Sequence, residues 1–244
     1  MKKIAKMLEP GKIGTLEIKN RVCMPALGLN FCNDNTMNDR WINFYEERAK
    51  GEVGLIIVSS GLEYTGQKGY EQLPLSEKMG YLPSLGDDRY LPGWRRLADA
   101  LHRHGAKVGV QIVHIGKYAH SNVLGGEQPI SPSPIKANMT VCGMPGEVPR
   151  EMTKDDIQIA INNIADTVKR AQTAGLDTIE YNVCSGYLMR EFLSPITNQR
   201  IDEYGGSLEN RMRFLLEVIQ CTREKVGHDF PLTVRLSADE FLDR

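Results

Sequence analysis

Short apolar runs alternate with longer amphipathic stretches along most of the chain. Five of the runs have the length and composition of β-strands: residues 21–27, 54–60, 107–114, 177–183 and 231–237. Three of them are almost unbroken apolar cores instead of alternating patterns, which is typical of strands buried on both faces of a parallel sheet.

The stretches between these runs repeat apolar residues at helical spacing. They predict four helices, at residues 38–50, 92–103, 153–174 and 207–226. The third opens with Thr153 and, three residues later, Asp156, a spacing close to a capping box. The resulting order, β-α-β-α-β-α-β-α-β, predicts a parallel sheet with right-handed crossovers.

The links between these elements indicate the fold type. Each helix-to-strand link is short and has a glycine where a residue that ends a helix is expected. These glycines are Gly51, Gly105, Gly175 and Gly227. The strand-to-helix links at residues 61–91, 115–152 and 184–206 are long, which is typical of a (β/α)8 TIM barrel, an α/β fold whose active site is built from those loops. A doubly wound sheet is the alternative, but no G-x-G-x-x-G follows the first strand.

The number of elements is too small for a complete barrel. Residues 1–244 supply about five strands and four helices, whereas a barrel needs eight of each. We therefore expect one TIM-barrel domain that is incomplete at its C-terminal end. The fifth strand would leave an open sheet edge. This predicts a fragment of a longer protein, or a homo-oligomer or another partner that covers the edge.

Composition and charge exclude several classes of protein. Lys and Arg number 30 against 31 Asp and Glu, a net charge of −1, so no electrostatic argument supports binding to nucleic acid or an anionic membrane. No apolar run approaches the ~18 residues of a membrane span, and the N-terminus lacks the apolar core of a secretory signal. The five cysteines are odd in number and contain no C-x-x-C pair, which favours a reducing, cytoplasmic location and argues against a zinc site. They are Cys23, Cys32, Cys142, Cys184 and Cys221.

Polar, mostly uncharged residues stand at the carboxyl ends of the predicted strands. They are Gln111, Asn182, Ser185, Tyr187 and Arg235. No lysine ends the fourth or fifth strand, which disfavours a Schiff-base aldolase. His102 and His104 form the closest histidine pair, but they lie at a helix end on the opposite face, where surface cations are the simplest interpretation.

Three members of this set have side chains with a candidate chemical role. The Gln111 amide can both donate and accept at the edge of a heterocycle. An inward-facing Arg235 is costly unless it meets an anion, although pairing with Glu180 is the alternative. Tyr187, with an ordinary pKa of about 10, would be protonated at neutral pH and able to protonate a carbanion, although a simple rim aromatic is the alternative.

A longer signature makes the chain recognisable. The segment GYLMREFLSPITNQRIDEYGGSLENRMRF at residues 186–214 closely resembles a signature of the Old Yellow Enzyme family of flavin-dependent ene-reductases. KNRVCMPAL, FYEERAKGEVGLIIV, VQIVHIGK and VRLSADE also match, so the resemblance covers essentially the whole chain. It is most similar to the branch of dienoyl-CoA reductase and related NADH:flavin oxidoreductases.

The resemblance implies FMN at the mouth of the barrel, NAD(P)H as electron donor and a small unsaturated substrate. Hydride would pass from the flavin to the β-carbon of an activated alkene, and Tyr187 would protonate the α-carbon. Gln111 would bind the pyrimidine edge and Arg235 the N1/O2 side of the flavin. The remaining expected flavin contacts are Pro25, Ala26, Leu27 and Ser60.

The chain also departs from the family pattern. Asn182 and Ser185 stand where many members have two histidines, or a histidine and an asparagine, that bind the substrate carbonyl. The dienoyl-CoA branch shares this loss, and it favours an alkene activated by a thioester or carboxylate. Leu27 replaces a flavin-tuning Thr or Cys. An iron–sulfur cluster and FAD, as in longer members, would require a longer natural chain, because the cysteines here lack the cluster's spacing.

Other signature residues have a mainly structural interpretation. His114 and Lys117 are expected to hold the third long loop, although either could reach a substrate. A scaffold role at the start of the fourth helix is expected for Asp202, Gly205, Gly206, Asn210 and Arg211.

The leading hypothesis is therefore the N-terminal part of an FMN-dependent oxidoreductase that reduces an activated C=C bond. The alternative is a non-catalytic, truncated half-barrel that binds no flavin on its own. Another phosphate-handling barrel, an aldolase or isomerase, fits the fold but not the site residues.

Overall fold

Five parallel strands form one sheet in which each strand lies beside its successor along the chain. The computed structural model describes residues 2–32, 34–59, 82–141 and 143–240. The strands are β3 (Cys23–Met24), β4 (Leu55–Ser59), β5 (Lys107–Ile112), β8 (Thr178–Val183) and β9 (Leu232–Leu236). The sheet order is β3-β4-β5-β8-β9, and every pairing is parallel. This is a partial TIM barrel, as predicted, since a doubly wound sheet reverses its strand order. The first strand is much shorter than the predicted 21–27.

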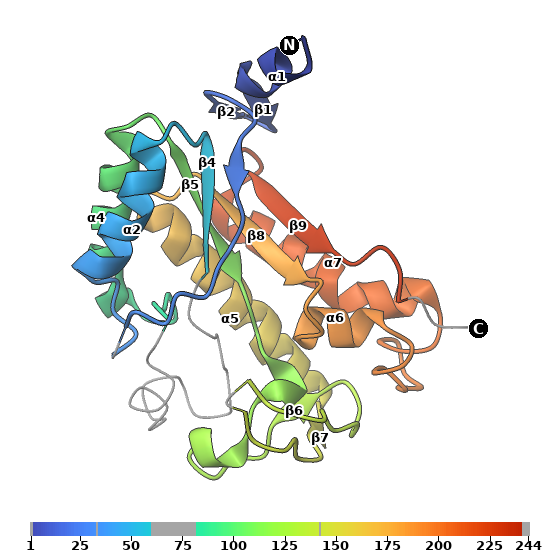
Figure 1. The fold of residues 1–244 in the computed structure, drawn as a ribbon. Coiled ribbons are helices and arrows are strands. Elements are labelled where there is room, and N and C mark those ends of the chain that lie inside the picture. The colour runs from blue at the N-terminus through green and yellow to red at the C-terminus, as the bar shows by residue number, and fades with distance from the viewer. Residues whose placement is uncertain (1, 33, 60–81, 142, 241–244) are drawn as a thin grey trace.

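Four long helices cover the outer face of the sheet (Figure 1). They are α2 (Asp39–Lys50), α4 (Leu91–His102), α5 (Lys154–Thr173) and α7 (Leu208–Val226). Each begins and ends within about one residue of its predicted limits. Helix α5 packs on α7, and α2 packs on α4.

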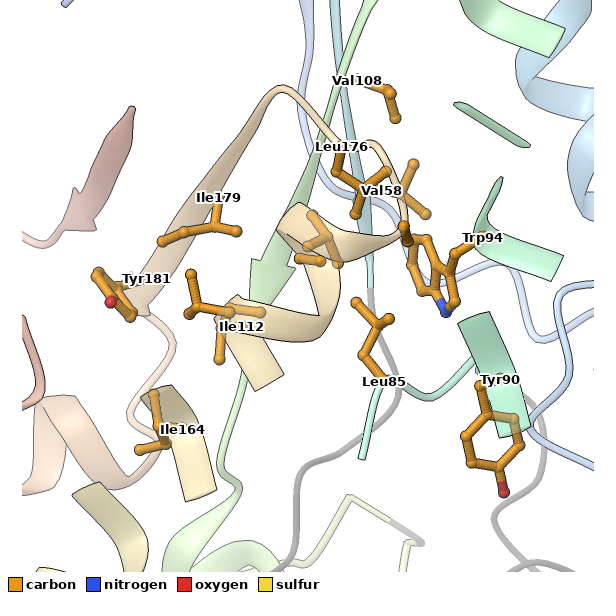
Figure 2. Packing of buried hydrophobic residues seen from close by; sticks show 14 of the residues in the cluster. Val58, Leu85, Tyr90, Trp94, Val108, Ile112, Ile164, Leu176, Ile179 and Tyr181 are labelled. Carbon is orange, nitrogen blue, oxygen red and sulfur yellow. The ribbon is translucent and has the colours of Figure 1, made fainter. Parts of the chain in front are cut away.

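The main core lies between these helices and the sheet. Figure 2 shows Val58, Val108 and Ile112 from the strands beside Trp94 and Leu176. All five side chains are at most 3% exposed. Burying a large apolar side chain contributes about 1.5–3 kcal/mol, so this layer is the main stabilising feature of the fold.

A hairpin that the sequence analysis did not predict lies at the amino ends of the strands (Figure 1). It pairs β1 (Gly11–Ile13) with β2 (Leu16–Ile18) and follows α1 (Lys2–Leu8). Ile18 packs against Leu55 and Ile57 on the inner face of the sheet. The hairpin therefore covers inward-facing apolar side chains at the end opposite the long loops.

The long strand-to-helix links lie at the carboxyl ends of the strands (Figure 1). The link after β4 includes η2 (Asp88–Tyr90), and most of the rest of it, residues 60–81, lies outside the described part of the chain. The link after β8 contains an unpredicted helix, α6 (Leu188–Leu193). The link after β5 contains η3 (Gly116–Tyr118), η4 (Ser121–Val123), β6 (Ile130–Ser131) and β7 (Arg150–Glu151).

The open edge expected at the fifth strand is confirmed. Val234 is 43% exposed and Leu236 is 55% exposed on β9, whereas all of β4 except Ser59 is buried. The predicted oligomer or partner that would cover this edge stays a prediction.

Three of the four predicted helix-ending glycines adopt the left-handed conformation. Gly105, Gly175 and Gly227 have φ values of +67°, +86° and +83°. Gly51 also ends its helix, as the C-cap of α2, but with a φ of −75°. Its N–H still bonds to the Glu47 carbonyl at 3.1 Å, so the left-handed step falls one residue later, at Glu52.

The signature residues after α6 act as scaffold, as expected. Asp202 accepts two hydrogen bonds from the Arg200 guanidinium, at 3.0 and 2.6 Å. Asn210 donates to the Gly205 carbonyl at 3.0 Å, and Arg211 donates to the carbonyls of Leu193 and Gly206. These bonds tie the loop to the first turn of α7.

The predicted cap of α5 is a complete capping box. Thr153 and Asp156 bond to each other's backbone N–H, at 3.1 and 2.7 Å. Asp156 also accepts from the Arg150 guanidinium at 2.7 and 3.0 Å, and these contacts lower the pKa of its carboxyl to about 2. Because that pKa lies below the unfolded value, the stabilisation is present at neutral pH and is lost as the pH falls from about 4 toward 2.

We therefore expect Asp156→Asn to lower the free energy of unfolding by about 1–2 kcal/mol at pH 7, with a smaller difference from wild type at pH 3. Urea denaturation across this pH range measures the effect. Asp155→Asn, an exposed carboxylate in the same helical turn, is the control. A difference that does not change with pH would contradict the assigned role of the ion pair.

Candidate active site

The inner face of the sheet carries the predicted polar residues near its carboxyl edge. Side chains alternate along β8, and its residues Ile179, Tyr181 and Val183 belong to the outer core, so Glu180 and Asn182 face inward. The strand register places Gln111 beside Glu180 and Arg235 beside Asn182. Three predicted site residues from three strands therefore share one face.

Hydrogen bonds join the middle of this group. The Asn182 Oδ1 accepts from the backbone N–H of Cys184 at 3.3 Å and of Ser185 at 3.1 Å. The Asn182 Nδ2 donates to Gln111 Oε1 at 3.0 Å, and Gln111 Nε2 donates to Glu180 Oε1 at 2.6 Å. Asn182 and Gln111 are buried, so this network determines how the turn after β8 and the Gln111 amide are oriented.

Arg235 does not pair with Glu180, which was the alternative to an anion-binding role. The Glu180 carboxylate accepts from Gln111 instead. Within the described residues the exposed Arg235 guanidinium forms no hydrogen bond or ion pair. A cation that no described residue pairs with therefore lies next to the Gln111 network.

Tyr187 lies at the start of α6, in the turn that Asn182 holds. Its ring makes an edge contact with Tyr118, with centroids 5.7 Å apart and planes at 88°. Burial is the main cause that raises the pKa of Tyr187 above its ordinary value, and Tyr118 adds to the shift. Gly186, at φ +79°, allows the Tyr118 hydroxyl to approach, since a Cβ there would lie 3.1 Å from it. The phenol is therefore half-buried, held by another aromatic ring, and protonated at neutral pH.

Known proteins are similar to this chain in both sequence and fold. The profile of the NADH:flavin oxidoreductase / NADH oxidase family matches residues 6–244. The chain belongs to this family. It is 41% identical to a metal reductase of Desulforamulus reducens and 40% identical to an NADH oxidase of Thermoanaerobacter brockii, in each case over 97% of the chain.

The solved structure of morphinone reductase superposes on 94% of the chain with a TM-score of 0.82 and 30% identity. The chain covers 61% of morphinone reductase. It spans about a third of the length of the two curated relatives, 33% and 35%. The predicted Old Yellow Enzyme resemblance and barrel fold are thereby confirmed, and the chain is similar to flavin oxidoreductases that use NADH.

The residues present suit the flavin that this family uses. Pro25, Ala26 and Leu27 follow β3, and Leu27 is 50% exposed, so apolar surface is available at the mouth. Gln111 retains one amide N–H and one lone pair beyond its two bonds, which a flat heterocycle edge can use. Arg235 supplies a cation that no other described residue pairs with. Ser60, another expected contact, lies outside the described residues.

Asn182 and Ser185, the two expected substrate contacts, differ in how many of their polar groups already form hydrogen bonds. The Asn182 side-chain oxygen and one of its N–H groups bond within the network, which leaves one N–H for a substrate. Ser185 is exposed, and its hydroxyl lies 3.5 Å from the Cys184 thiol. Both assignments stay predictions.

The loop after β5 is tied to α6 by a buried carboxylate that the sequence analysis missed. Glu191 is 1% exposed and accepts from the Lys117 backbone N–H at 3.1 Å and from Ser131 Oγ at 2.9 Å. Burial raises the pKa of Glu191 and lowers that of Lys117. The only sequence signal was a single carboxylate in the short apolar segment LMREFL.

His114 and Lys117 hold this loop, as expected. His114 is buried, its Nδ1 accepts from the Gly116 N–H at 3.1 Å, and its carbonyl accepts from the Leu188 N–H at 2.9 Å. Burial lowers the pKa of His114 to about 4, so its imidazole is neutral at pH 7. The Lys117 side chain is also buried.

The predicted surface pair His102 and His104 lies away from this loop. His102 bonds to Asp177 at 2.7 Å and His104 to Glu46 at 3.1 Å, at the amino end of the sheet. In the described ranges, no group of three or more His, Cys, Asp or Glu side chains is placed to hold a metal ion. None of the described helices has the length and apolar character needed to cross a bilayer.

The contact between Gly116 and Glu191 can be tested with two glycines of nearly equal φ. Gly116 has φ +55° and a Cβ there would lie 2.6 Å from the Glu191 carboxylate oxygens, whereas Gly14 has φ +57° and open space. We expect Gly14→Ala to cost about 1 kcal/mol from backbone strain, and Gly116→Ala at least about 2 kcal/mol more from the steric clash. Chemical denaturation measures both. Equal losses would show that the loop can move away from Glu191.

Proposed function

We propose that the chain forms the flavin- and substrate-binding part of an FMN-dependent oxidoreductase that reduces an activated C=C bond with electrons from NAD(P)H. The observation that carries this proposal is the gathering of Gln111, Asn182 and Arg235 on one face of the sheet, with Tyr187 in the turn that follows. The strands that carry Gln111, Asn182 and Arg235 are neighbours in the parallel sheet.

The chain's own groups would hold the cofactor in a defined way. Pro25, Ala26 and Leu27 would face the ring system with backbone and apolar surface, and Gln111 would bind its polar edge. Arg235 would stabilise negative charge on the ring. When bound, FMN supplies the redox chemistry, accepting electrons from NAD(P)H and delivering hydride to the alkene.

Tyr187 would complete the reduction by proton transfer. The alkene gains hydride at its β-carbon, and the electron pair of the C=C bond then forms a bond from the α-carbon to the proton of the Tyr187 hydroxyl. The phenolate that results regains a proton from solvent. The raised pKa keeps the hydroxyl protonated before the reaction, and the edge contact with Tyr118 keeps the ring in place.

Asn182 and Ser185 would bind the group that activates the alkene. Both can donate a hydrogen bond, and neither is an imidazole. This favours an oxygen acceptor such as a carboxylate or thioester carbonyl, so we propose an enoate, an enoyl- or dienoyl-CoA, or a similar alkene as substrate.

The visible absorbance spectrum of the purified protein, before and after addition of FMN, tests the proposal. We expect bands of bound flavin that bleach under anaerobic NAD(P)H. A protein that remains colourless with excess FMN would favour the alternative, a half-barrel with the family's ancestry but without a flavin site of its own.

Tyr187→Phe tests the proton donor. We expect reoxidation of the reduced protein by an alkene to slow about 100-fold or more, because the phenol no longer supplies a proton, while reduction by NAD(P)H keeps its rate. Stopped-flow absorbance measures the two half-reactions separately. Tyr90→Phe, which removes a hydroxyl from the outer core, is the control. Equal slowing of both half-reactions would refute the role of Tyr187.

A further inference from the structure

The bonds around Gln111 form a chain whose direction is set from both ends. Backbone N–H groups of Cys184 and Ser185 can only donate, so the Asn182 atom facing them is Oδ1. Its Nδ2 is thereby turned toward Gln111. At the other end the Glu180 carboxylate accepts, so the Gln111 atom facing it is Nε2. Both ends specify the same amide orientation.

The opposite orientation of Gln111 is disfavoured at two contacts. A flipped amide would place Oε1 against the Glu180 carboxylate oxygen, now 2.6 Å from Nε2, and Nε2 against the Asn182 Nδ2, now 3.0 Å from Oε1. Two acceptors and two donors would then face each other in a partly buried region, where unmatched polar groups are costly.

We propose that Glu180 is a positioning residue for flavin binding, which rests on the proposed function. Its carboxylate holds the Gln111 amide so that the second N–H and the second lone pair point away from the network in a fixed order. A flavin pyrimidine edge has its own fixed order of N–H and carbonyl groups. Glu180 therefore determines which edge Gln111 can bind without itself touching the ring.

This role explains why a carboxylate faces inward at this position although a cation is nearby. Arg235 lies on the neighbouring strand, opposite Asn182, yet the Glu180 carboxylate bonds to Gln111 and not to Arg235. The Glu180 carboxylate orients the Gln111 amide, and the Arg235 guanidinium can therefore pair with an anionic ligand.

Substitutions at Glu180 that separate charge from hydrogen bonding test this inference. Glu180→Met and Glu180→Gln both remove the charge, but only Glu180→Met also removes the acceptor. We expect Glu180→Met to weaken FMN binding roughly three- to tenfold, since a freed glutamine must be reordered on binding. Glu180→Gln should stay within about twofold of wild type. Flavin fluorescence titration of the full-length protein measures the affinities.

A double-mutant cycle shows whether Glu180 acts through Gln111. In a Gln111→Ala background, Glu180→Met should cause no further loss of FMN affinity. The infrared carbonyl bands of bound FMN should shift in Glu180→Met and return to their wild-type position in Glu180→Gln. Glu180→Leu is made in parallel, so that the result does not depend on the folding of one variant.

Glu224→Met is the matched control, because Glu224 accepts from the Gln220 side chain at 3.3 Å on the outer helix α7. It should leave FMN affinity unchanged. Suppose that the wild-type protein binds FMN and that Glu180→Met and Glu180→Leu bind it with the same affinity. This result would overturn this inference alone. The same holds if Glu180→Met lowers FMN affinity as much in the Gln111→Ala background as in the wild type. A wild-type protein that binds no FMN would instead overturn the proposed function.

Discussion

The register of β8 between β5 and β9 is the constraint on which the site depends. Because side chains alternate from face to face along a strand, a shift by one residue would turn Asn182 toward the helices and Val183 toward the mouth. The outer core prevents this shift, since Ile179 and Tyr181 are fully buried there, and the Tyr181 hydroxyl bonds to Thr222 on α7 at 2.7 Å. Packing on the outer side thereby determines the chemistry on the inner side.

Most of the fold could be predicted because its elements carry long, regular patterns. The strand β4 is a continuous apolar run, and α5 repeats apolar residues over 20 positions. Among the elements that were missed, α6 has six residues and the β1–β2 hairpin has three residues per strand, too few for a period to be recognised. Gly51 ends its helix without a left-handed φ because its N–H bonds to the Glu47 carbonyl, a local geometry that composition does not specify.

The sequence predicted which polar residues gather at the carboxyl edge of the sheet, but not the hydrogen bonds between them. Gln111 and Asn182 were identified because polar residues at strand ends are unusual in otherwise apolar runs. Gln111 and Asn182 bond to each other, and Glu180 bonds to Gln111 and not to Arg235. These contacts depend on which of several long side chains lies within hydrogen-bond distance. Glu191 was missed for a related reason, since a single buried carboxylate has no sequence pattern and is recognised only by what surrounds it.

The strand order also bears on how the chain acquires its structure. Every strand of the sheet pairs with the strand that precedes it in the sequence, so each β-α unit finds its docking surface already made by the part synthesised before it. The interval between β5 and β8 is the widest, although the intervals between β4 and β5 and between β8 and β9 also hold a long loop and a helix. Folding can therefore proceed from the N-terminus during translation, and the addition of β8 closes the longest loop, at the largest cost in chain entropy.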